Sequence, residues 1–220
     1  MNTQSGEFGE LMKQTFMTRR GVKPLLSFLI VKPLQIAALL LLFTVVGCAS
    51  PEEKIAEYLQ TGDALLAEGN LAKARVQYRS ALQLNDQVAS AWFGLAKIAE
   101  REQKWQQVLG FATRCVELAP DHVEALTLRG EVLLLAGEYD QVLSITDTLA
   151  TLEPESASVM ALRAGALYRL DQTSEAIALA EQALKQNPAE EAATMMLAAA
   201  MMQSGKPGQA VAYVQRGIAA

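Results

Sequence analysis

Histidine and cysteine, the side chains best suited to catalysis near neutral pH, are scarce in this 220-residue chain. The only histidine is His122, and the only cysteines are Cys48 and Cys115. A single imidazole cannot form a histidine-pair metal site, and no second one can support a proton relay around it. Aspartate and glutamate are numerous but scattered, and no glycine-rich phosphate loop occurs. We therefore expect no catalytic residue, no metal site and no bound cofactor.

Cys48 follows a largely apolar run, residues 34–46, and Gly47; the residues before the run include Arg19, Arg20, Lys23 and Lys32. As a helix, these 13 residues would span about 20 Å, which is short of the ~30 Å hydrocarbon core of a bilayer. Such a run is typical of the apolar region of an export signal rather than of a membrane span.

The residues Val45, Val46, Gly47 and Cys48 resemble the lipobox of bacterial lipoproteins. The resemblance implies a signal peptide at 1–47, with an n-region at 1–33 and an h-region at 34–46. It also implies cleavage before Cys48 and a covalent lipid on its thiol. Because Ala49, and not aspartate, follows the cysteine, the resemblance implies a lipid anchor in the outer membrane, facing the periplasm.

Two other interpretations of the leader stay open. Residues 25–46 would be long enough to cross a bilayer as an uncleaved anchor if the interruption at Lys32 and Pro33 were tolerated. The pair Arg19 and Arg20 suggests twin-arginine export only weakly, because few apolar residues follow it. Translation could also begin at Met12 or Met17.

Downstream of the leader, Pro120, Pro154 and Pro188 lie 34 residues apart. A helix-turn-helix pair needs about 14 residues per helix and a short turn, and proline ends each pair. The spacing predicts a short tether at 48–54 and then an all-α array of five units, at residues 55–88, 89–122, 123–156, 157–190 and 191–220. Because repeats of this kind contact only their neighbours, they form an extended surface rather than a closed pocket.

The repeated positions resemble the tetratricopeptide repeat, which implies a right-handed α-solenoid. Small residues stand at the eighth position of each unit: Gly62, Ala96, Gly130, Ala164 and Ala198. Glycine stands at the fifteenth in three units, where a left-handed turn is expected: Gly69, Gly137 and Gly205. The pattern departs from the family at four residues. Gln103 and Asp171 stand where the turn glycine is expected, Leu149 stands where a small residue is expected, and Asp86 stands where proline is expected.

The resemblance also implies a groove lined by one stripe of each first helix, which takes proteins or extended peptide segments. Carried over to this chain, the groove residues are Leu59, Asp63, Leu66, Phe93, Lys97, Arg101, Glu131, Leu134, Tyr168, Arg169, Met195 and Met202. Lys97, Arg101 and Arg169 would meet acidic groups of a partner. The alternative is that several of these residues only pack between helices, above all the methionines 195, 196, 201 and 202.

Charge excludes one class of partner. From Cys48 onward the chain has 14 basic and 22 acidic residues, so 14 − 22 gives a formal net charge of −8. Nucleic-acid binding needs clustered lysine and arginine, so we expect no nucleic-acid partner.

Cys115 falls at a packing position and is expected to be a small buried side chain. The last unit is four residues short of a full repeat and exposes an apolar helix, so further repeats or a second subunit are expected beyond it.

The segments 47–54, 62–69 and 78–85 resemble the tetratricopeptide lipoproteins associated with PEP-CTERM/exosortase and exopolysaccharide loci. This resemblance implies a non-enzymatic, lipid-anchored scaffold in envelope, exopolysaccharide or secretion assembly. Two alternatives are a pilotin-like lipoprotein for assembly of the type IV pilus secretin and a single-span membrane adaptor with the same repeats.

Overall fold

The computed structural model describes residues 50–220, which form ten α-helices and no strand. The leader, the lipobox residues and Cys48 lie outside the described residues. The helices are α3 (Pro51–Ala67), α4 (Leu71–Leu84), α5 (Ala89–Arg101), α6 (Trp105–Leu118), α7 (Val123–Ala136), α8 (Tyr139–Leu152), α9 (Ala157–Arg169), α10 (Thr173–Gln186), α11 (Glu191–Gln203) and α12 (Pro207–Ala219). The all-α solenoid of helix-turn-helix units predicted from the sequence is confirmed.

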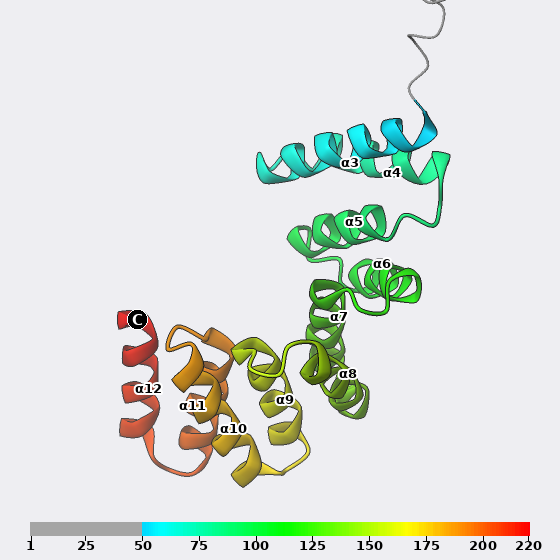
Figure 1. The fold of residues 1–220 in the computed structure, drawn as a ribbon. Helices are drawn as coiled ribbons and strands as arrows, with labels where there is room; N and C mark the ends of the chain where they lie inside the picture. Colours follow the sequence, from blue (N-terminus) through cyan, green and yellow to red (C-terminus); the bar gives the residue numbers. More distant parts are fainter. Residues whose placement is uncertain (1–49) are drawn as a thin grey trace, which may run out of the picture. The chain divides into compact units, whose positions relative to one another are not determined.

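Each odd-numbered helix packs against the even-numbered helix that follows it, and each pair packs against the next pair (Figure 1). First helices of neighbouring pairs also contact each other, most extensively at α9 and α11. Helices α5 and α7 contact each other least, and α6 provides most of the contact between their two pairs. Side chains of α5 and α7 still meet in one buried cluster, which includes Ala96, Ala99, Leu128 and Val132.

The turn inside each pair has the same backbone path in all five units. Its central residue has a positive φ, between 58° and 84°, and the residue after it donates a hydrogen bond to the carbonyl five residues back. Gly69, Gly137 and Gly205 adopt this conformation as expected, and so do Gln103 and Asp171. A left-handed residue with a side chain costs about 1–2 kcal/mol, so the packing of the flanking helices imposes the turn at these two residues.

Helix α3 begins with a capping box. The Ser50 hydroxyl accepts a hydrogen bond from the Glu53 amide at 3.1 Å, and the Ser50 amide donates to the Glu53 carboxylate at 2.8 Å. The helix therefore includes Pro51–Lys54, which the sequence analysis assigned to a tether. At α7, His122 takes the same role, because its Nδ1 accepts a hydrogen bond from the Ala125 amide at 3.3 Å.

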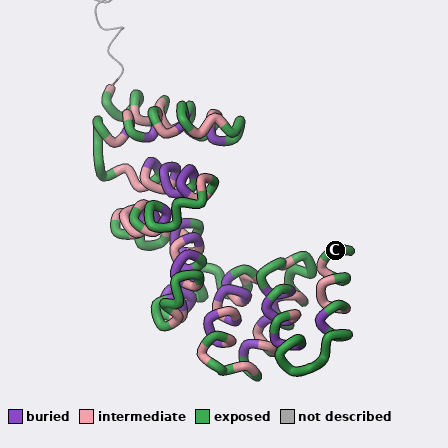
Figure 2. Tube along the Cα trace, turned by 180° about the vertical axis from the view of Figure 1, so that it is seen from behind, coloured by how far each residue is buried: buried purple, intermediate pink, exposed green. Residues whose placement is uncertain are grey.

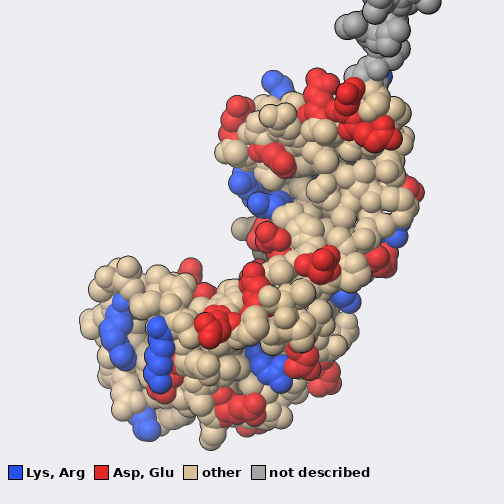
Figure 3. Space-filling view, viewed as in Figure 1, with Lys and Arg blue, Asp and Glu red and all other residues tan. Residues whose placement is uncertain are grey.

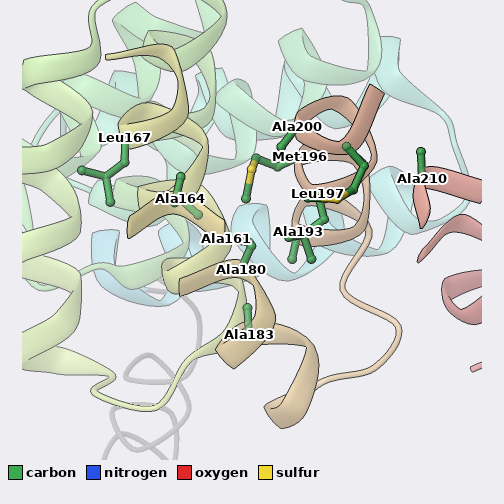
Figure 4. Packing of buried hydrophobic residues seen from close by; sticks show 12 residues of the cluster. Ala161, Ala164, Leu167, Ala180, Ala183, Ala193, Met196, Leu197, Ala200 and Ala210 are labelled. Atoms are coloured by element: carbon green, nitrogen blue, oxygen red, sulfur yellow. The ribbon is translucent and has the colours of Figure 1, made fainter. Parts of the chain in front are cut away.

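Alanine is the commonest residue of the buried core. Figure 2 shows buried residues where the helices face one another, and Figure 4 shows a cluster of alanines between α9, α10 and α11. The twentieth position of every unit is buried: Ala74, Val108, Val142, Ala176 and Ala210. Leu149, a departure from the small-residue pattern, is also fully buried and packs with the α7, α8 and α9 cluster. Helices can approach closely only where side chains are this small.

Tyr78 is the largest side chain with no exposed surface, and two glycines make room for it. A Cβ atom on Gly62 of α3 would lie 2.8 Å from the Tyr78 ring, and one on Gly94 of α5 would overlap the ring more severely. The Tyr78 hydroxyl donates a hydrogen bond to the Asp63 carboxylate at 2.6 Å. One side chain of α4 thus joins the first pair of helices to the second.

We predict that Gly94→Ala lowers the free energy of unfolding by about 1–3 kcal/mol, the usual effect of overfilling a packed core. Gly110→Ala is the matched control, because Gly110 lies in α6 with no atom near its missing Cβ. That change should raise stability by up to about 1 kcal/mol through helix propensity. Urea unfolding followed by circular dichroism measures both. Equal effects of the two changes would contradict the packing described here.

Candidate functional site

Two adjoining hollows lie along the first helices α5, α7, α9 and α11. The larger has a volume of about 610 Å³ and is lined mainly by residues of α7, α9 and α11. The smaller, of about 480 Å³, is lined mainly by residues of α5 and α7. Glu131 and Ser158 line both hollows, so the two form one continuous groove. We refer to this surface as the groove.

Seven of the twelve residues assigned to a partner groove from the sequence line these hollows: Phe93, Lys97, Glu131, Leu134, Tyr168, Arg169 and Met195. They come from four consecutive first helices. The structure therefore brings together, over α5 to α11, residues that the repeat places on one stripe.

The stripe does not continue onto α3. Leu66 is only 5% exposed and belongs to the core, and Leu59 packs against the same cluster. Asp63 accepts the hydrogen bond from Tyr78, and the Arg101 guanidinium donates to the carbonyl oxygen of Leu66. None of these four residues lines the two hollows: Leu66 is buried in the core, whereas Asp63 and Arg101 remain exposed, so their contact with a partner stays a prediction.

The four methionines of α11 divide into two kinds. Met196 and Met201 are buried in the cluster of α9, α10 and α11, as expected of core residues. Met195 is 58% exposed and lines the larger hollow. Met202 is also exposed but lies outside both hollows, so its contact with a partner stays a prediction.

The larger hollow has an apolar wall of Leu134, Leu135, Tyr168 and Met195. Leu135 is 73% exposed, the most exposed large apolar residue of α7. The sequence analysis missed it, although it stands at the same position of its unit as Arg101 and Arg169. The Tyr168 hydroxyl donates a hydrogen bond to the Gln203 side chain, which fixes the ring at the edge of the wall.

Acidic side chains dominate the charge of the groove. The groove has only two basic residues, Lys97 and Arg169. Five glutamates line it: Glu100, Glu124, Glu131, Glu153 and Glu190. Figure 3 shows acidic side chains on the hollowed side of the array. The pKa of Glu131 is raised above its usual range, first because the groove walls restrict its hydration and then because Glu100 and Glu190 repel its charge.

Aromatic contacts hold the α5 end of the groove. The Lys97 ammonium nitrogen lies 5.7 Å from the centre of the Phe93 ring, and the His122 and Phe93 ring centres are 4.6 Å apart. Such cation–aromatic contacts keep the charge of Lys97 beside Phe93. No sequence pattern indicated the contact between Phe93 and His122, because the two residues belong to opposite ends of one unit.

Other reactive groups are withdrawn from the surface. Cys115 is fully buried, and its burial raises the pKa of the thiol to about 11, with a smaller contribution from Glu124. A thiol in this state is a packing group rather than a nucleophile. Within residues 50–220, no cluster of acidic, histidine and cysteine side chains is arranged to hold a metal ion. None of the helices described is long and apolar enough to span a bilayer.

Two known protein families match the helical array. The model of the bacterial transcriptional activator domain matches residues 53–179, more than half of the chain, and the model of the tetratricopeptide repeat matches residues 167–220. The chain belongs to the bacterial transcriptional activator domain family, and its repeats are of the tetratricopeptide type. The two matches together extend over residues 53–220, which is nearly the whole helical array. A comparison with curated proteins finds no match.

Several solved structures share the tetratricopeptide solenoid. MamA (residues 41 to the end) from Desulfovibrio magneticus RS-1 is 16% identical with a TM-score of 0.64, over 75% of this chain and 93% of that one. YrrB, described as a tetratricopeptide-repeat protein with an unusual peptide-binding site, is 15% identical with a TM-score of 0.61, over 77% and 91%. PilF of Pseudomonas aeruginosa is 19% identical with a TM-score of 0.63, over 77% and 78%. Likeness at this level of identity establishes the fold.

We predict that Glu131→Gln stabilises the chain at neutral pH. An acid whose pKa is raised by folding binds its proton more tightly when folded, so the free energy of unfolding falls as pH rises through the raised pKa. Glutamine carries no charge, so Glu131→Gln does not lose stability as the pH rises. The variant should therefore be more stable than wild type above the raised pKa and equally stable below the usual pKa of glutamate.

Urea unfolding of wild type and Glu131→Gln measures the difference in free energy of unfolding. Measurements from about pH 3.5 to about pH 8 cover the titration of a glutamate with a raised pKa. Glu57→Gln, on the exposed surface of α3 outside the groove, is the control. A Glu131→Gln variant that loses stability at neutral pH would contradict this description of the groove.

Proposed function

We propose that this chain is a non-enzymatic scaffold whose groove holds extended segments of partner proteins. The observation that carries the proposal is the continuous hollow formed by four first helices, with an apolar wall beside a row of charged side chains. Tetratricopeptide-type folds typically serve protein–protein interaction. The peptide-binding site described for YrrB supports the same role for this fold.

The groove suits a peptide better than a small metabolite. Its larger hollow, of about 610 Å³, has room for several side chains but is open along the helices. Exposed apolar residues such as Leu135 and Met195 supply contact area, and an extended backbone can follow the row of helices.

The groove can be tested by truncating its wall. Leu135→Ala combined with Met195→Ala should weaken partner binding at least about tenfold, since two anchor residues that contribute roughly 1 kcal/mol each together exceed the ~1.4 kcal/mol of a tenfold change. Both side chains are largely exposed, so the helical circular dichroism signal should persist. Pull-down from solubilised membranes with the full chain, followed by quantitative mass spectrometry, provides the measurement.

The matched control removes apolar surface elsewhere. Val76→Ala combined with Leu84→Ala truncates two exposed side chains of α4, outside the groove. This pair should leave capture unchanged. The proposal fails if the two double variants lose the same partners to the same degree.

We further propose that Cys48 carries a lipid that anchors the scaffold at the bacterial outer membrane, facing the periplasm. Support comes from the residues 45–48 and from the short apolar run before them. Together with the local resemblance to PEP-CTERM/exosortase-associated lipoproteins, this favours a role in envelope, exopolysaccharide or secretion assembly. Alternatives are a pilotin-like role in secretin assembly and a single-span adaptor.

The family match favours a second candidate, a protein-binding module of a bacterial transcription regulator. With a formal net charge of −8 from Cys48 onward, such a module would act through protein contacts and not through nucleic acid. This candidate needs no lipid and no export.

Metabolic labelling with a fatty-acid analogue separates these candidates. A lipoprotein should be labelled as wild type, should lose the label in Cys48→Ala, and should leave the membrane fraction in that variant. A single-span adaptor would stay in the membrane without label, and a regulatory module would be found unlabelled in the soluble fraction. Equal labelling of wild type and Cys48→Ala would rule out Cys48 as the anchor.

A further inference from the structure

The carboxylates of the groove have few partners within the described chain: the Asn187 side-chain amide donates to Glu190 at 3.4 Å, and the His122 imidazole lies 3.2 Å from Glu124. The ion pairs between Lys or Arg and Asp or Glu in residues 50–220 are Arg75–Glu102, Lys104–Glu102, Arg114–Glu117 and Arg163–Asp147. None of these pairs involves a glutamate of the groove. The groove therefore presents a set of negative charges that its own lysine and arginine side chains leave unneutralised.

The two basic residues of the groove do not change the negative sign of its net charge. Lys97 is held beside the Phe93 ring at the α5 end, and Arg169 lies at the end of α9. Arg101, which the sequence analysis offered to acidic partners, is bound to the Leu66 carbonyl. Five glutamates against two basic residues make the groove attractive to cations, and its concave walls strengthen the field.

Glu131 is the point at which this charge meets the apolar wall. It lines both hollows, so the same side chain borders Glu100 on one side and Leu134, Tyr168 and Met195 on the other. Restricted hydration and, after it, repulsion from Glu100 and Glu190 make its charge costly in the free protein. A cation placed among these three carboxylates would offset the repulsion.

We propose that the groove selects an extended peptide segment in which a lysine or arginine stands next to a bulky apolar residue. The basic side chain lies among Glu100, Glu131 and Glu190, and the apolar one packs against Leu134, Tyr168 and Met195. This inference rests on the proposed function, that the groove binds peptides, and adds the chemistry of the ligand. It reverses the expectation that Lys97, Arg101 and Arg169 receive acidic groups.

Fluorescence anisotropy with the full chain and three pools of labelled decapeptides tests the proposal. One pool combines lysine or arginine with leucine, the second replaces the basic residues by glutamate, and the third keeps them but replaces leucine by serine. The first pool should bind most tightly, and its affinity should fall as salt is added, because salt screens exposed charges.

Glu100→Gln combined with Glu131→Gln should weaken binding of the first pool roughly fivefold to tenfold, as expected for two partly exposed charge contacts. Glu57→Gln combined with Glu175→Gln changes the net charge equally on exposed surfaces of α3 and α10 and should leave the affinity unchanged. Equal weakening by both pairs would reduce the effect to net charge and overturn the inference.

The remaining outcomes separate this inference from the proposed function. Tighter binding of the glutamate pool, or equal binding of the leucine and serine pools, overturns the ligand chemistry while the groove remains a peptide site. If no pool binds and the wall variants still capture partners, then the proposed function itself fails.

Discussion

Close approach of neighbouring helices, made possible by small side chains at fixed positions, is the constraint on which this structure depends. The eighth and twentieth positions of the units are occupied by glycine, alanine or valine, and nearly all of them are buried. Where a large residue enters, glycine compensates, as Gly62 and Gly94 do around Tyr78. Without this compensation, the pairs could not stack in register, and no continuous groove would form.

The groove follows from that packing. Each first helix buries its sides against its own second helix and against the neighbouring pair, which leaves one stripe uncovered. Along this stripe a smaller hollow lies between α5 and α7, and Glu131 joins it to the larger hollow with its apolar wall on α7, α9 and α11. The repeat therefore determines where the groove lies, and the glutamates that line it determine its charge.

The fold was predictable because the 34-residue spacing repeats without insertion and each turn has a clear physical cause. Gln103 and Asp171 show why departures from the pattern did no harm: the flanking helices impose the left-handed turn even without glycine. The groove was predictable over α5 to α11 but not at α3, where Leu66 is buried in the core and Asp63 accepts the hydrogen bond from Tyr78. Its acidic character was not foreseen, since Glu153 and Glu190 come from the connections between pairs rather than from the stripe.

Backbone-amide NMR of the full chain, titrated with a decapeptide that combines arginine and leucine, shows directly whether the first helices form the docking surface. If the first helices form an acidic and apolar docking groove, saturable chemical-shift changes will cluster on α5, α7, α9 and α11. The largest changes are expected around Glu131 and Tyr168. Changes confined to the second helices, or an equal response to a peptide with glutamate in place of arginine, would contradict the account.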